Sequence, residues 1–113
     1  MILKLMWKDK NDNAYHIGNL TKKEETYIFE IKENDLKDAI KQGCMGIGEF
    51  DLLKNYYTSK ELFEFFKQRI PDKNHPHIDK ILKKYELKNY DEMLLLEKTK
   101  GLLMTDRYFI EKD

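Results

Sequence analysis

The chain has 113 residues, 41% of them hydrophobic, and its 21 basic side chains balance 21 acidic ones. This length fits one domain, and a substantial apolar fraction with zero net charge argues against a disordered chain. The two signs also balance within each third of the sequence. Because nucleic-acid binding usually shows as a basic stripe, the sequence does not indicate direct binding of DNA or RNA.

The sequence shows no targeting or membrane segment. The run Met1–Lys8 is too short, and too interrupted by lysine, for a signal peptide or a membrane span. No later stretch approaches the ~18–20 apolar residues that spanning a bilayer requires. One cysteine, Cys44, excludes a disulfide within the chain. We therefore expect a cytoplasmic protein with a single domain over residues 1–113.

The first third of the chain predicts a meander of three antiparallel strands. Leu3, Leu5 and Trp7 alternate with lysines, which is the period of a half-buried strand. A turn rich in Asn and Asp at residues 10–13 separates it from a second strand, in which Gly18 marks a bulge or a close approach of two backbones. The three predicted strands cover residues 3–8, 15–20 and 26–31.

The middle of the chain predicts a short helix and an irregular segment. Asn34 or Asp35 can cap a helix whose apolar stripe contains Leu36, Ala39 and Ile40, and Gly43 can end it. The segment Cys44–Phe50, with two glycines and little polarity, is either a short strand or a buried loop.

The second half predicts three helices and a closing strand. Thr58 and Glu61 have the spacing of a capping box, which opens a phenylalanine-rich helix that ends before Pro71. Asn74 is the expected cap of the next helix. These elements are a helix over residues 59–70, a helix over 76–85, a helix over 91–98 and a strand over 108–110. Strands followed by helices indicate an α+β fold, a small antiparallel sheet with three to four short helices on one face.

The sequence contains no constellation that points to catalysis, a metal or a cofactor. The three histidines, His16, His75 and His77, lack the spacing of a zinc site. Ser59, the only serine, is better explained by a helix start than by a nucleophile. Gly43, Gly46 and Gly48 resemble a phosphate loop in composition but lack the Gly-Lys-Ser/Thr that follows one. We therefore expect no enzyme activity and no cofactor.

Apolar side chains exceed what a solitary domain requires. Met93–Leu96 are four apolar residues in a row, which point in all directions around a helix, so the helix is either buried on several sides or meets a partner. Aromatic side chains bury large areas at interfaces at little entropic cost. The predicted contact residues for a protein partner are Trp7, Tyr56, Tyr57, Phe65 and Leu95.

Several segments together resemble a known family. The pieces are Tyr15–Thr21, the helix Leu62–Phe66, the step Arg69–Asp72, and the run Ile81–Tyr85 followed by Asp91–Leu95. In this order they resemble the N-terminal subdomain of bacterial HipA-type serine/threonine kinase toxins, and its stand-alone form in split toxin–antitoxin systems. Similar segments accompany HIRAN domains. The resemblance covers nearly the whole chain, and its most specific piece is the phenylalanine-rich helix that ends in Pro-Asp.

The resemblance implies an α+β module that packs on a kinase core and restrains it, with a helix-turn-helix antitoxin as a further partner. It brings no catalytic residues. The chain departs from these kinases after Gly101, where it leads to Tyr108–Ile110 instead of a glycine-rich segment that enters a kinase body. The function expected is a non-catalytic protein-interaction module. The alternative is an accessory domain of a DNA-handling, HIRAN-type protein.

Overall fold

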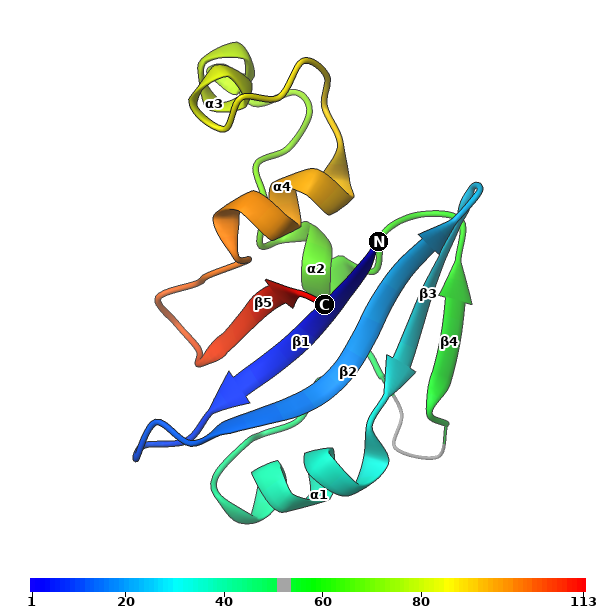
Figure 1. The fold of residues 1–113 in the computed structure, drawn as a ribbon, viewed down its shortest axis with the longest axis vertical. Coiled ribbons are helices and arrows are strands. Elements are labelled where there is room, and N and C mark those ends of the chain that lie inside the picture. The colour runs from blue at the N-terminus through cyan, green and yellow to red at the C-terminus, as the bar shows by residue number, and fades with distance from the viewer. Residues whose placement is uncertain (51–53) are drawn as a thin grey trace.

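The computed structural model describes residues 1–50 and 54–113. A five-stranded antiparallel sheet in the order β4-β3-β2-β1-β5 and four helices make a small α+β fold, which confirms the predicted fold class (Figure 1). No helix in the described part of the chain has the length and apolarity needed to cross a membrane. The strands are β1 (Ile2–Lys8), β2 (Ala14–Lys23), β3 (Thr26–Ile31), β4 (Tyr56–Ser59) and β5 (Tyr108–Lys112), and the helices are α1 (Glu33–Lys41), α2 (Glu64–Lys67), α3 (Ile78–Lys84) and α4 (Glu92–Thr99).

The sheet has one buried and one open face, as the alternating pattern of its strands requires. Leu3, Leu5 and Trp7 of β1 are buried, as are every second residue of β3 and two residues of β5. α2 and α4 pack against this buried face. α3 has no buried residue and lies beyond the end of the sheet (Figure 1).

Gly18 lies at a close approach of the β2 and β3 backbones. The register of β2 against β1 shifts between Leu5 and Met6, so Ile17 is an extra residue and forms a bulge next to Gly18. A Cβ on Gly18 would lie 2.5 Å from the carbonyl oxygen of Glu30. Both predicted roles of Gly18, a bulge and a close approach, are therefore confirmed.

Asp9 organises the β1–β2 turn. Its carboxylate accepts hydrogen bonds from the backbone amides of Asn11 and Asn13 and from the hydroxyl of Tyr15. Burial acts to raise the pKa of Asp9, but the hydrogen bonds from Asn13 and Asn11 outweigh it, so the pKa lies below the ordinary value of 3.8.

Asp9 therefore makes stability depend on pH. Because its pKa is lowered in the folded state, the unfolded chain takes up a proton first as the pH falls, and the stabilisation by the carboxylate is lost as the pH passes through the folded pKa. We expect Asp9→Asn to destabilise the protein near neutral pH and to cost progressively less below about pH 4. Urea unfolding of both proteins across this range measures the difference, and a constant gap would contradict the assignment.

The expected boundaries of α1 and of the element after it need correction. Neither Asn34 nor Asp35 caps α1, whose N-cap is Lys32 without a side-chain hydrogen bond. Gly43 follows the helix with φ of +108°, as expected of a residue that ends it. Residues 44–50 form a loop and not a strand, but only Cys44 and Phe50 are buried, so the expectation of a buried loop holds for the loop and not for its burial.

The expected capping box is wrong. Thr58 belongs to β4, a strand that was not predicted, and α2 begins only at Glu64. The oxygen of Ser59 accepts a hydrogen bond from the amide of Glu61, which makes a turn after β4. Asn74 is likewise not a cap, because the N-cap of α3 is His77. α4 and β5 lie where they were predicted, and Asp91 caps α4 by accepting a hydrogen bond from the amide of Leu94.

Candidate functional site

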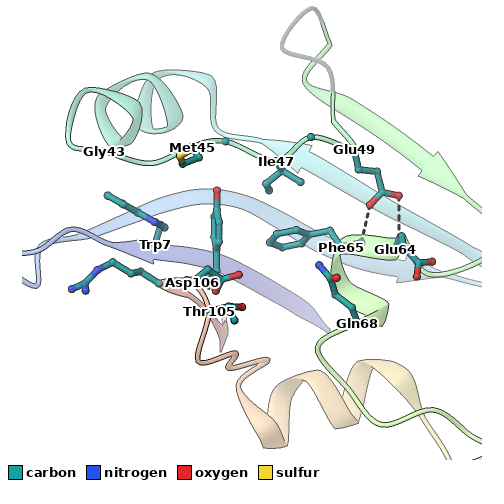
Figure 2. Close-up of a pocket in the computed structure, with 14 residues that line it drawn as sticks. Trp7, Gly43, Met45, Ile47, Glu49, Glu64, Phe65, Gln68, Thr105 and Asp106 are labelled. Carbon is teal, nitrogen blue, oxygen red and sulfur yellow. Dashed lines mark hydrogen bonds between the residues drawn. The ribbon is translucent and has the colours of Figure 1, made fainter.

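A cavity of about 500 Å³ opens on the buried face of the sheet (Figure 2). Its walls come from three parts of the chain, namely residues 43–49, which we call the glycine loop, α2 with Gln68, and residues 105–108. Trp7, Phe65 and Tyr108 form its floor, and we call it the aromatic pocket. This volume is typical of ligand pockets in proteins.

The register of the sheet assembles the floor. Trp7 of β1 pairs directly with Tyr108 of β5, so the two rings project from neighbouring strands onto the same face. Phe65 points from α2 into the space between the glycine loop and Trp7 (Figure 2). Its ring meets that of Tyr108 edge to face, with 5.1 Å between the centroids and an interplanar angle of 85°. This is a favoured geometry for an aromatic pair.

The glycine loop is anchored at both ends. Cys44 is buried, and its Sγ lies 3.1 Å from the hydroxyl of Tyr108. At the other end, the carboxylate of Glu49 accepts hydrogen bonds from the backbone amides of Glu64 and Phe65 at 3.1 and 2.8 Å. Glu49 thereby caps the first turn of α2 from a distant part of the chain, which explains why the helix begins at Glu64 without a local cap.

Met45 is the exposed part of the glycine loop. Its side chain is 96% exposed although it lines the aromatic pocket. Gly46 has a φ of +76°, a backbone conformation that side chains rarely adopt, and no atom lies within 4 Å of a Cβ built there. The loop therefore presents a flexible apolar side chain beside the aromatic floor, a combination typical of adaptable binding surfaces.

The opposite wall depends on a buried ion pair. Arg69, whose side chain is fully buried, pairs with Asp106 and donates a hydrogen bond to the carbonyl of Gly101 at 2.9 Å. Its guanidinium lies over the ring of Phe65, 4.3 Å from the centroid, and near that of Tyr108. Arg69 therefore supports the floor of the pocket from outside its lining.

Arg107, a further charged residue of the wall, also has structural partners. Arg107 donates hydrogen bonds to the carbonyls of Lys8 and Asp9 at 2.7 and 2.6 Å, which ties residues 105–108 to β1. The pKa of Tyr108 is raised by burial first and then by its hydrogen bond with Cys44. The phenol therefore stays protonated, and as a neutral group it acts as an apolar surface with one hydrogen-bonding end.

The five predicted contact residues lie in four different places. Trp7 and Phe65 both lie in the floor of the aromatic pocket, where they are largely buried, with 6% and 9% of their surfaces exposed. Tyr56 is 52% exposed on the open face of the sheet, whereas Tyr57 is half-buried against Phe50, with 4.9 Å between the ring centroids. Leu95 has no exposed surface and packs in the core.

The apolar run on α4 is explained within the fold. Met93, Leu95 and Leu96 are all buried, so the first of the two alternatives for this helix is correct. The interior of the domain surrounds α4 on several sides, so its apolar side chains are part of the hydrophobic core. We therefore withdraw Leu95 as a contact residue for a partner.

Other residues weighed for chemistry do not converge. In the part of the chain that the structure describes, no three His, Cys, Asp or Glu side chains are grouped so that they could hold a metal ion. His16 contacts the side-chain oxygen of Asn19 at 2.7 Å, while His75 and His77 are exposed beside one another before α3. None of these histidines lines the aromatic pocket.

Sequence reasoning missed Met45, Glu49 and Tyr108 as pocket residues. The glycine spacing around Met45 marks a loop with an unusual backbone and could have indicated Met45 and Glu49, whereas no local pattern indicates Tyr108. Comparisons of the chain with protein-family models, with curated proteins and with solved structures found no match.

Proposed function

We propose that this chain is a non-catalytic protein-interaction module that docks through the aromatic pocket on a HipA-like serine/threonine kinase and modulates it. The setting is a bacterial toxin–antitoxin system in the cytoplasm, with a helix-turn-helix antitoxin as a further partner. The observation that carries the docking part is the pocket itself, in which a floor of three aromatic rings lies beside the exposed Met45.

The composition of this surface supports binding of a protein. Aromatic residues and methionine are enriched where proteins meet. Here Met45 is almost fully exposed, while Trp7, Phe65 and Tyr108 each keep less than a tenth of their surface exposed at the bottom of the pocket. The charged groups of the wall support the same reading, since Glu49, Asp106 and Arg107 each hold a neighbouring segment in place. The kinase as partner comes from the sequence resemblance, whose most specific piece, the Leu62–Phe66 segment followed by Pro-Asp, includes Phe65 of the pocket floor.

Co-purification from the native cell tests this function. The tagged chain is expected to recover a protein with a kinase domain, and Met45→Asp is expected to lose it, because a carboxylate placed beside the aromatic floor would have to be desolvated on docking. Met45 is almost fully exposed, so the variant should fold normally. The matched control is Tyr56→Ser, which alters an exposed aromatic residue on the other face of the sheet.

The activity of the recovered kinase gives the second readout. Adding an equimolar amount of the wild-type chain should lower its autophosphorylation, whereas the Met45→Asp chain should not. Recovery of no kinase, or equal recovery by Met45→Asp, would contradict the proposal. Salt-sensitive binding of short DNA duplexes in a fluorescence anisotropy titration would favour the DNA-handling alternative instead.

A further inference from the structure

The aromatic pocket is negatively charged although the chain as a whole is neutral. Its lining contains three carboxylates, those of Glu49, Glu64 and Asp106, against one guanidinium, that of Arg107, which gives a formal charge of −2. The net charge of the complete sequence is zero. A charged site of one sign next to apolar walls attracts groups of the opposite sign more strongly than an open surface does.

The negative charge is concentrated at one end. Asp106 and Arg107 pair with side chains outside the wall, and these two charges of opposite sign cancel. Glu49 and Glu64 remain, both at the α2 end of the pocket (Figure 2). The carboxylate of Glu49 is held by the amides of α2.

Glu64 is the acidic group that is open to a partner. Its side chain is exposed, and its carboxylate makes no hydrogen bond or ion pair with any residue in 1–50 or 54–113. One turn later, directly after α2, Gln68 also lines the pocket, and its side-chain amide has no hydrogen-bond partner within the same residues. An uncompensated carboxylate and a free amide therefore stand next to the ring of Phe65.

We propose that the aromatic pocket binds a partner segment in which a large apolar side chain lies next to a lysine or arginine. This preference rests on the proposed function and names the chemistry that it recognises. The apolar side chain enters the pocket against Met45 and covers the small areas of the Trp7 and Phe65 rings that remain exposed. The neighbouring cation pairs with Glu64, and this charge pairing sets the direction in which the segment lies.

Trp7 supplies the measurement, because it is the only tryptophan of the chain and its ring lines the pocket. Short capped peptides without aromatic residues, carrying Leu-Leu-Lys-Lys between Gly and Ser, should change its fluorescence on binding. A peptide with Glu in place of Lys, and one with Ser in place of Leu, should bind at least several-fold more weakly. The affinity of the basic peptide should fall as salt is added, since exposed charges are screened.

Two variants locate the cation. Glu64→Gln should weaken the basic peptide by about twofold to fivefold, which is the range of an exposed ion pair, and Glu64→Lys should weaken it further. Glu25→Gln is the control, because it makes the same change of charge at the β2–β3 turn, on an exposed residue outside the pocket lining.

The outcomes test the preference for a basic peptide independently of the proposed kinase docking. Equal binding of the basic and acidic peptides, with no effect of Glu64→Gln, would overturn the preference for a cation and leave docking at the pocket intact. Binding of no peptide would also overturn the preference, whereas the co-purification of a kinase and its loss in Met45→Asp decide the proposed function separately. Equal effects of Glu64→Gln and Glu25→Gln would show that only the net charge of the protein matters. That result would also overturn the pairing of the cation with Glu64.

Discussion

Replacing Gly18 with alanine is expected to destabilise the protein by about 3 kcal/mol or more, because there is no room for a methyl group. The added Cβ would lie 2.5 Å from the carbonyl oxygen of Glu30 and 2.7 Å from Cζ of Phe29. The first atom belongs to the backbone of β3, and the second to one of the largest fully buried side chains. Relief therefore requires that two central strands separate or that the core repacks.

Gly48→Ala is the matched control for this prediction. Nothing lies within 4 Å of a Cβ at Gly48, and its φ is outside the left-handed region, so the same chemical change meets neither a clash nor strain. Urea unfolding followed by circular dichroism should show a much lower midpoint for Gly18→Ala and a nearly unchanged midpoint for Gly48→Ala. Similar midpoints for the two variants would show that β2 and β3 are not as close as described.

Asp106→Asn is expected to cost about 3 kcal/mol, because it leaves the cation of Arg69 buried without a counter-charge. The Arg69 side chain is fully buried, whereas that of Asp106 is 29% exposed. Water near Asp106 compensates part of the loss, which places the effect at the lower end for a broken buried pair. The pocket should also loosen, since the guanidinium lies over the rings of Phe65 and Tyr108.

A double-mutant cycle separates the broken pair from a local packing defect. Arg69→Met removes the buried charge and keeps an apolar side chain of similar length, so the double variant Arg69→Met with Asp106→Asn should be more stable than Asp106→Asn alone. Thermal unfolding of the four proteins gives the coupling energy. A double variant as unstable as the sum of both single changes would mean that the two residues do not act as a pair.

Local periodicity was sufficient to predict β1, β2, β3 and β5. Along β1, for example, Leu3 and Leu5 alternate with lysines, and one buried face explains both the strand and its orientation. The bulge or close approach at Gly18 could be predicted because a glycine inside a strand marks such a site. These features depend on neighbours within a few residues, which a sequence displays directly.

The errors at α2 and β4 have a long-range cause. The spacing of Thr58 and Glu61 fits a capping box, but the amides of α2 are satisfied by Glu49, fifteen residues before Glu64 along the chain. Thr58 pairs with Ile28 instead and extends the sheet by one strand. Local propensity loses to tertiary hydrogen bonds here, and no pattern near Thr58 reveals the competition.

Only part of the candidate site could be predicted, because its assembly also depends on contacts between residues far apart in the sequence. Trp7 and Phe65 stand out as large aromatic residues, and both lie in the pocket floor. Their meeting with Tyr108 depends on β5 pairing with β1, and the hydrogen bond of Tyr108 with Cys44 joins residues 64 positions apart. Leu95 was misassigned because a run of leucines around a helix gives the same sequence pattern whether the core of the domain or a partner covers it.

The pairing of β1 with β5 also determines when the aromatic pocket can form. The two strands lie at opposite ends of the sequence and side by side in space (Figure 1), so their joining closes the longest loop of the chain and is entropically the most demanding step. During synthesis, Trp7 leaves the ribosome long before Tyr108 exists. The aromatic pocket is therefore absent from a nascent chain until Tyr108 has been made and β5 has paired with β1.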